Sequence, residues 1–130
     1  MIVLLISMIC VLMIGSLQFL FKREVSDFHV FSFSSFIALL YAYVTVLVGF
    51  GLIYTVLEMH HYSVLAGQYE PYQSYLLTLY NSLYFSAVTL FSVGYGDMYP
   101  VGIGKGIVIV ESLVGYIMPA LFVLRTVNRT

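Results

Sequence analysis

Long apolar runs separated by short polar stretches set the pattern of this chain. Three runs, at 1–21, 36–57 and 107–127, are each long enough to cross the hydrocarbon layer of a membrane as a helix, for which about twenty residues suffice. A fourth apolar run, 74–91, is too short to span if it is helical. The pattern therefore predicts three membrane-crossing helices and one short helix that enters the membrane without crossing it.

Composition supports lipid as the surrounding solvent. Of the 130 residues, 62% are hydrophobic and 8% are charged. A small soluble fold has too little interior to bury that much apolar surface. No basic footprint for nucleic acid is visible, and the single Cys10 excludes a disulfide within one chain.

Basic residues mark the expected cytoplasmic ends of the first and last runs. Lys22 and Arg23 follow the first run, and Arg125 and Arg129 lie at the end of the last. The positive-inside rule therefore places the N-terminus outside and the C-terminus in the cytoplasm. A secretory signal would carry its positive charge before the apolar run, but a cleaved signal and a helix lying along the membrane surface stay open as alternatives for 1–21.

The polar stretch 58–74 falls on the outer side in this topology. The outer face then carries Glu58, Glu70 and Asp97, an acidic mouth that would concentrate cations. His60 and His61 could sense pH or bind a metal, although an exposed loop pair is the better interpretation.

Two glycines interrupt the second apolar run. Gly49 and Gly51 would let a neighbouring helix approach closely, or they are incidental, since glycine is common in membrane helices.

Residues 92–97, with the sequence SVGYGD, hold the candidate chemistry. Gly94 and Gly96 free the backbone to enter left-handed conformations, so that successive carbonyl groups can point the same way and replace the water shell of a cation. The short helix before them would aim its carbonyl end at the middle of the membrane. The alternative is a tight Gly-Tyr-Gly turn between two helices.

The run 92–97 resembles the TVGYGD selectivity filter of potassium channels, and residues 36–130 resemble the pore module of the potassium channel superfamily, of the bacterial two-transmembrane type. The resemblance implies an all-α membrane protein whose pore domain, 28–130, holds an outer helix (36–58), a pore helix (75–91), a filter (92–97) and an inner helix (103–127). The helix and cytoplasmic linker at 1–27 have no counterpart in that module.

The resemblance also implies residue roles. K+ would bind to the backbone carbonyls of Val93, Gly94 and Tyr95 and to the carbonyl and hydroxyl of Ser92, while Gly96 completes the outer turn. Asp97, Tyr84 and Thr89 would support the filter, and Tyr99 would ring the outer mouth. One filter strand encircles nothing, so a homotetramer is expected.

Two departures from the family pattern concern the filter. Ser92 replaces the usual threonine and keeps its hydroxyl. Val88 lies where some bacterial channels carry a glutamate that bonds the filter aspartate, so that Asp97 needs another donor, and the Tyr84 hydroxyl is the candidate.

The last apolar run contains one acid, Glu111, at a depth where a carboxylate is costly and usually functional. The stretch 111–115 resembles the inner helix of inward-rectifier-type channels, in which the acid would face the pore helix near Thr89 or Ser86 and brace the filter. An acid that reaches the outer surface is the alternative.

Gly115 and Pro119 give this run two places to bend. Gly115 falls at the family's gating hinge, and Pro119 removes a helical hydrogen bond. Either residue could instead serve packing alone.

Together these features favour a potassium-selective channel that passes K+ passively, in a multi-pass protein of the bacterial plasma membrane. K+ in the filter is the only cofactor expected, and no nucleophile–base pair suggests an enzyme. The alternatives are a non-conducting or regulatory membrane subunit and a pore-loop subunit of a potassium uptake system, although such subunits carry several pore loops in one chain.

Overall fold

The computed structural model describes residues 1–23, 33–67 and 74–127, which form helices and two short strands. In chain order these elements are α1 (Ile2–Arg23), α2 (Phe33–Met59), β1 (Leu65–Gly67), α3 (Tyr75–Leu90), β2 (Met98–Pro100) and α4 (Gly104–Val127). The helices expected at 36–58, 75–91 and 103–127 correspond to α2, α3 and α4, with small differences at their ends.

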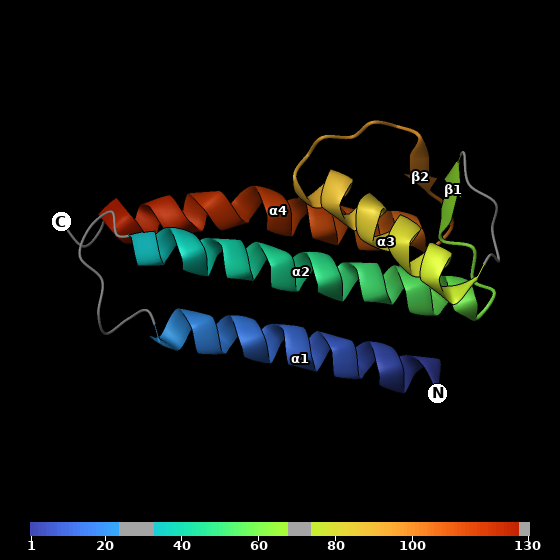
Figure 1. Cartoon of the computed structure of the whole chain (residues 1–130), viewed down its shortest axis with the longest axis horizontal. Helices are drawn as coiled ribbons and strands as arrows, with labels where there is room; N and C mark the ends of the chain where they lie inside the picture. Colours follow the sequence, from blue (N-terminus) through green and yellow to red (C-terminus); the bar gives the residue numbers. More distant parts are fainter. Residues whose placement is uncertain (24–32, 68–73, 128–130) are drawn as a thin grey trace.

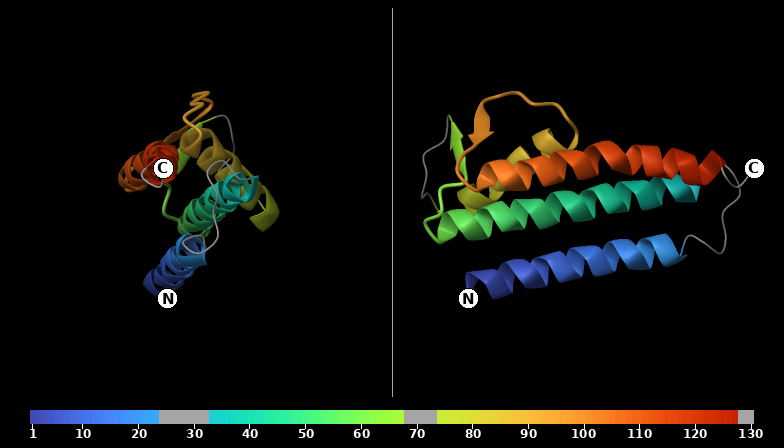
Figure 2. Two further views of the ribbon diagram at one scale, coloured as in Figure 1. Left: turned by 90° about the vertical axis from the view of Figure 1, so that its left-hand side faces the viewer. Right: turned by 180° about the vertical axis from the view of Figure 1, so that it is seen from behind.

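Three long helices lie side by side, with α2 in the middle (Figure 1). α1 packs along one side of α2, and α3 and α4 pack against other parts of its surface (Figure 2). Because α1 and α4 run in the same direction, their carboxyl-terminal ends lie at one end of the molecule, and the two strands lie at the other (Figure 1). Lys22, Arg23 and Arg125 therefore belong to one end, as the charge pattern predicts, while Arg129 lies outside the described residues.

α2 and α4 are suited to lipid along most of their length. Each contains a stretch long and apolar enough to cross a membrane, Phe36–Met59 and Gly104–Leu124, with a mean hydropathy of 2.3 in both. Only 33% and 11% of these stretches are buried inside the chain, whereas the core helix of a soluble protein would be mostly buried. By length and composition, the two helices fit a membrane protein.

α1 forms the helix that the first apolar run predicts, with Cys10 half-buried as a free thiol. The helix is 22 residues long, from Ile2 to Arg23. A membrane crossing by α1 stays a prediction.

Gly49 and Gly51 both lie at close helix contacts. A Cβ on Gly49 would lie 2.5 Å from Met13 Sδ of α1, and a Cβ on Gly51 would lie 2.6 Å from Leu83 Cδ2 of α3. The close-approach interpretation is therefore the correct one, and the two glycines face different neighbours.

β1 and β2 pair antiparallel and make a small sheet that the sequence analysis did not predict. Leu65 pairs with Pro100 and Gly67 with Met98. The expectation of an all-α protein is right for the helices and omits these strands. Their pairing ties the stretch after α2 to the residues that directly follow segment 92–97.

Candidate functional site

The chain around α3 has the course of a re-entrant loop. α3 starts at the end of the molecule that carries β1 and β2 and stops partway along α2 and α4, and residues 91–97 then return the chain to β2 (Figure 1). A helix that stops inside the membrane points its partially negative carbonyl end toward the interior. Non-helical backbone at that depth needs protein or a water-filled cavity around it.

Ser92 follows Phe91, the C-cap residue of α3, and begins the glycine-rich segment. Its N–H donates to Thr89 O at 3.0 Å, and the N–H of Val93 donates to Val88 O at 2.9 Å. These two bonds make a Schellman motif, which places a left-handed residue directly after the helix. Ser92 accordingly has a φ of 56°, which is uncommon for a residue other than glycine. The helix end thus fixes the backbone at which the segment starts.

The backbone of segment 92–97 alternates in handedness. φ is positive at Ser92 (56°), Gly94 (58°) and Gly96 (77°), but not at Val93 or Tyr95 between them. A Cβ on Gly94 or Gly96 would meet no atom within 4 Å, so backbone conformation, and not space within one chain, requires glycine at these positions. Such alternation is compatible with successive carbonyl groups that point the same way, as the sequence analysis expects.

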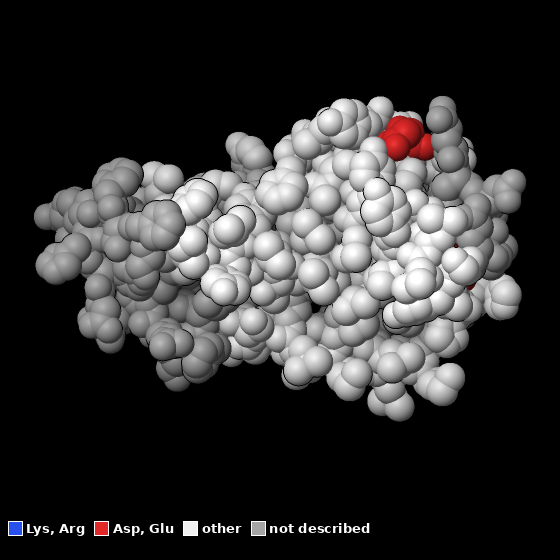
Figure 3. Space-filling model, viewed as in Figure 1, with Lys and Arg blue, Asp and Glu red and all other residues white. Residues whose placement is uncertain are grey.

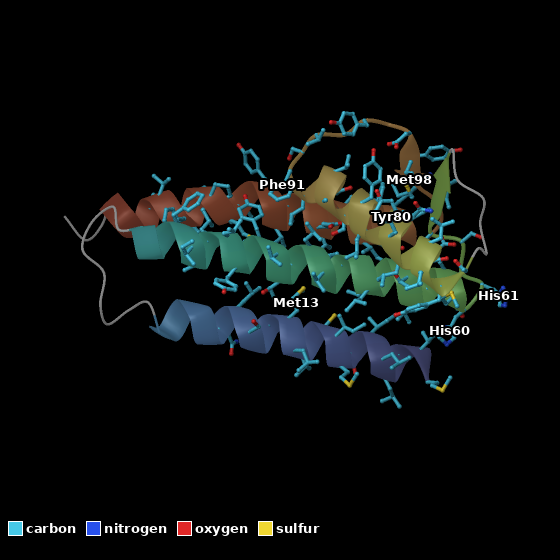
Figure 4. The ribbon with its side chains drawn as sticks, viewed as in Figure 1. Met13, His60, His61, Tyr80, Phe91 and Met98 are labelled. Carbon is cyan, nitrogen blue, oxygen red and sulfur yellow. The ribbon has the colours of Figure 1, made fainter. Side chains whose placement is uncertain are left out.

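The segment lies on the outside of the single chain. Val93 and Tyr95 are 51% and 72% exposed. Phe91 marks the segment's inner end beside α3, and Met98 on β2 marks its outer end (Figure 4). One chain therefore leaves residues 92–96 exposed.

Two contacts hold the outer end of the segment. Tyr84 Oη donates a hydrogen bond to Asp97 Oδ2 at 2.8 Å, which is the contact that the sequence analysis expected. This hydrogen bond is the main cause that raises the pKa of Tyr84 above its ordinary value. On β1, Gly67 packs so closely that a Cβ would overlap Asp97 O. Asp97 is thus held between α3 and β1.

The other residues expected near the segment lie at its two ends. Thr89 is half-buried in the last turn of α3, and its carbonyl accepts the Ser92 bond. Tyr99 lies on β2 and is 53% exposed, beyond the outer end.

Glu111 of α4 is completely buried against α2 and α3. Ser86 Oγ donates to Glu111 Oε1, and Tyr54 Oη donates to Glu111 Oε2 at 2.7 Å. Of the two partners expected for Glu111, Ser86 is confirmed as a contact, whereas Thr89 supplies no hydrogen bond to it. The alternative of an acid that reaches the outer surface is wrong, because the carboxyl has no exposed area.

The hydroxyl of Ser86 has two acceptors and one proton. Glu111 Oε1 and the carbonyl oxygen of Leu47, at 2.9 Å, both lie within hydrogen-bond distance of Ser86 Oγ. A hydroxyl donates only one bond. The Ser86 hydroxyl therefore bonds α4 through Glu111 or α2 through Leu47, with its single proton on one acceptor at a time.

Glu58 does not belong to an exposed acidic mouth. It is 3% exposed, and its Oε1 accepts the N–H groups of Val64 at 2.7 Å and Leu65 at 2.9 Å. The expectation of a surface acid is therefore wrong for Glu58, and Glu70 lies outside the described residues. Because β1 begins at Leu65, Glu58 fixes the start of the strand that contacts Asp97.

Charge is sparse on the face of the molecule that carries the segment. Acidic atoms appear there near the end with β1 and β2, and no basic side chain appears among the described residues of that face (Figure 3). Among the described residues of this face, charge therefore gathers at the end that carries β1 and β2.

Gly115 lies where α4 passes the end of α3. A Cβ on Gly115 would overlap Leu90 O and lie 3.1 Å from Leu90 Cδ1. Pro119 lies inside α4, which continues as a helix from Gly104 to Val127. Gly115 therefore has a packing role, and bending at these two residues stays a proposal.

The histidine pair follows α2, which ends at Met59. His60 Nδ1 lies 2.8 Å from Val56 O, and His61, two residues after the helix, adopts a left-handed φ of 62° (Figure 4). Within residues 1–23, 33–67 and 74–127, no group of three or more His, Cys, Asp or Glu side chains could hold a metal ion. The metal-site alternative for His60 and His61 gains no support.

Sequence reasoning missed two side chains that shape this site, Tyr54 and Glu58. A buried acid such as Glu111 needs donors from a facing helix, and this requirement points to the tyrosines of α2. An acid in the last turn of a helix, such as Glu58, can likewise bond the backbone of the turn that follows.

Comparison with known proteins adds a family. The family model described as "Ion channel" matches residues 53–130, from the second half of α2 through α4. Protein LctB of Bacillus caldotenax is 40% identical over 123 residues, which cover 94% of this chain and 92% of that protein. Protein LctB of Geobacillus stearothermophilus is 41% identical over the same length, with the same coverage. No solved structure matches the chain significantly.

Proposed function

The chain belongs to the potassium channel pore-domain superfamily of ion channels, and on this premise we propose that it is a potassium-selective channel. Four identical chains surround one pore, and K+ passes through it down its electrochemical gradient. The protein lies in the bacterial plasma membrane, with its N-terminus outside and the basic ends of α1 and α4 in the cytoplasm.

The observation that carries this proposal is the alternating backbone of segment 92–97. In the proposed filter, the carbonyls of Val93, Gly94 and Tyr95 replace the water shell of K+, and Ser92 adds its carbonyl and its hydroxyl. Gly96 completes the turn toward β2. Carbonyl oxygens without net charge bind a monovalent cation firmly enough to strip its water, and weakly enough to release it.

Side chains behind the filter keep this backbone in place. Asp97 and Tyr84 brace its outer end, Glu111 braces α3 from behind through Ser86, and Thr89 sits at the helix end. α4 gates the pore by bending near Gly115 and Pro119.

The apolar surface that one chain exposes supports assembly into a ring. Tyr95 is 72% exposed on the segment, and on α4 Tyr116 is 78% and Ile109 is 68% exposed. A single segment borders a pore on one side only, and closed symmetry with four copies completes it.

Ion flux into liposomes tests the proposal. We expect the purified full chain to pass K+ and to exclude Na+. Gly94→Ala should abolish the flux, because a left-handed alanine costs about 1–2 kcal/mol and distorts the carbonyl row. Gly15→Ala is the matched control, since a Cβ there also meets no atom within 4 Å, on a helix far from the segment.

Three results would overturn the proposal. The first is a wild-type protein that carries no K+ flux, which favours a non-conducting membrane subunit. The second is equal passage of Na+. The third is a Gly94→Ala variant with normal K+-selective flux, which would mean that segment 92–97 is not the filter.

A further inference from the structure

A side chain of α2 replaces a hydrogen bond that α4 lacks. In an α-helix the N–H of residue 119 would donate to the carbonyl of residue 115, but Pro119 has no N–H. Tyr43 Oη donates to Gly115 O at 3.1 Å from α2. The carbonyl at the bending site of α4 therefore receives its bond from a different helix.

The same tyrosine contacts the residue that precedes segment 92–97. The rings of Tyr43 and Phe91 stack with centroids 5.3 Å apart and an interplanar angle of 23°. Phe91 is the C-cap residue of α3, and Ser92 follows it directly. Such ring pairs contribute free energy beyond the area that they bury. Tyr43 thus joins α4 to the inner end of the segment through one rigid ring.

Gly115 also contacts the end of α3 directly. With no Cβ, its backbone lies against Leu90, the last residue of that helix. A movement of α4 at this point consequently changes two contacts at once, the packing on Leu90 and the bond to Tyr43.

We propose that Tyr43 is a positioning residue that couples the bending of α4 to the inner end of the proposed filter. This inference rests on the proposed channel function. When α4 bends at Gly115 and Pro119, the Gly115 carbonyl leaves the Tyr43 hydroxyl, and the ring no longer holds Phe91 in place. The backbone at Ser92, whose left-handed conformation depends on the end of α3, then changes with the gate.

A double-mutant cycle between Tyr43 and Pro119 separates this role from simple packing. Tyr43→Phe keeps the ring and removes the hydroxyl. Pro119→Ala restores the N–H that supplies the helical bond to Gly115, so that the hydroxyl becomes redundant. Tyr41→Phe is the matched control, since Tyr41 lies on the same helix and is 62% exposed.

The experiment uses the full chain and two readouts, thermal unfolding in detergent and single-channel open probability in K+. We expect Tyr43→Phe to lower the melting temperature and to change the ratio of open to closed times by about three- to tenfold, as for one interhelical hydrogen bond. In the Pro119→Ala background both effects should fall within error. Tyr41→Phe should leave both readouts unchanged.

Different failures have different meanings. Equal effects of Tyr43→Phe with and without Pro119 would overturn the inference. The inference would also be overturned if the melting temperatures showed coupling between Tyr43 and Pro119 while the open probability did not change. Tyr43 would then stabilise α4 without coupling it to the filter. A wild-type protein without K+ current contradicts the proposed function instead, and the melting cycle still tests the Tyr43–Gly115 bond.

If the Pro119→Ala protein does not assemble, a second pair of variants tests the same inference. Phe91→Leu removes the ring stack and leaves the bond to Gly115. Its effect on open probability should be non-additive with that of Tyr43→Leu, and additive effects would overturn the inference.

Discussion

The Tyr84 hydroxyl lies 2.8 Å from Asp97 Oδ2, so a residue in the middle of α3 holds the far end of the loop that follows the helix. The contact closes the loop across its outer end, where the chain turns into β2. Tyr84 thereby braces the outer end of the proposed filter.

Tyr84→Phe should loosen that outer end, because the ring remains and only the donor to Asp97 is lost. We expect K+ currents that decline several-fold faster during sustained conduction, with the protein still assembled. Recording macroscopic current decay checks this, and Tyr80→Phe, at a 68% exposed tyrosine one turn earlier, is the control. Identical decay in wild type and Tyr84→Phe would contradict the bracing role.

The pH dependence of this contact has a definite sign. The hydrogen bond to Asp97 raises the pKa of Tyr84 above its ordinary 10.0, so the phenol holds its proton more firmly in the folded chain. The stabilisation is fully present below the unfolded pKa and is lost as pH rises through the folded value. Current decay should therefore be constant from about pH 6 to 9 and accelerate above about 10. The Tyr84→Phe variant should lack this acceleration at alkaline pH. If the current decay of the wild type instead changed near neutral pH, and Tyr84→Phe abolished that change, the raised pKa of Tyr84 would be contradicted.

Glu111→Gln should be tolerated far better than Glu111→Ala. The amide offers a carbonyl to Tyr54 and a donor to Ser86, whereas alanine leaves the buried Tyr54 hydroxyl without an acceptor at a cost of about 1–3 kcal/mol. Thermal unfolding of both variants measures the difference. If glutamine destabilises as much as alanine, a negative charge at Glu111, and not its hydrogen bonds, is what α4 requires.

Glu58→Ala should weaken the start of β1. Two buried N–H groups, those of Val64 and Leu65, lose their acceptor, at about 1–3 kcal/mol for each group left unpaired. Glu58→Gln keeps one carbonyl oxygen and should retain most of the stability and the K+ selectivity. K+ selectivity and the melting temperature are measured on both variants. Normal selectivity in Glu58→Ala would show that the proposed filter does not depend on β1.

Gly51→Ala should push α2 away from α3. Its Cβ would lie 2.6 Å from Leu83 Cδ2 and 3.2 Å from Leu83 Cα, and overpacking of this kind costs about 1–3 kcal/mol. The control Gly15→Ala should be neutral or stabilising, because alanine favours a helix by up to about 1 kcal/mol over glycine. Unfolding of both proteins provides the test, and equal stability would exclude a tight α2–α3 contact at Gly51.

The sequence predicted the helices and the loop well, because both depend on local features. Length and uniform apolarity define α2 and α4, and Gly94 and Gly96 define where the backbone turns left-handed. The contact of Tyr84 with Asp97 was predictable through the resemblance to potassium channels, since Val88 lies where some bacterial channels carry the donor to the aspartate.

Features that depend on distant pairing could not be predicted in the same way. β1 and β2 are three residues each, too short to show an alternating pattern. Glu58 appeared as a surface charge because its partners are backbone N–H groups, which no side-chain pattern reveals. Tyr54 meets Glu111 across two helices whose relative depth follows only from their packing.

The left-handed Ser92 has a consequence for protein engineering. Because the left-handed residue that follows the C-cap of α3 is also the first residue of segment 92–97, the segment takes its starting geometry from the bonds to the carbonyls of Val88 and Thr89. Residues 92–97 grafted alone into another protein would lack the bonds that hold the positive φ of Ser92, from which the alternation of φ along the segment starts. A graft therefore needs at least the last turn of α3 together with the loop, and inserting one residue between Leu90 and Ser92 should change the backbone of 92–97 while leaving its sequence intact.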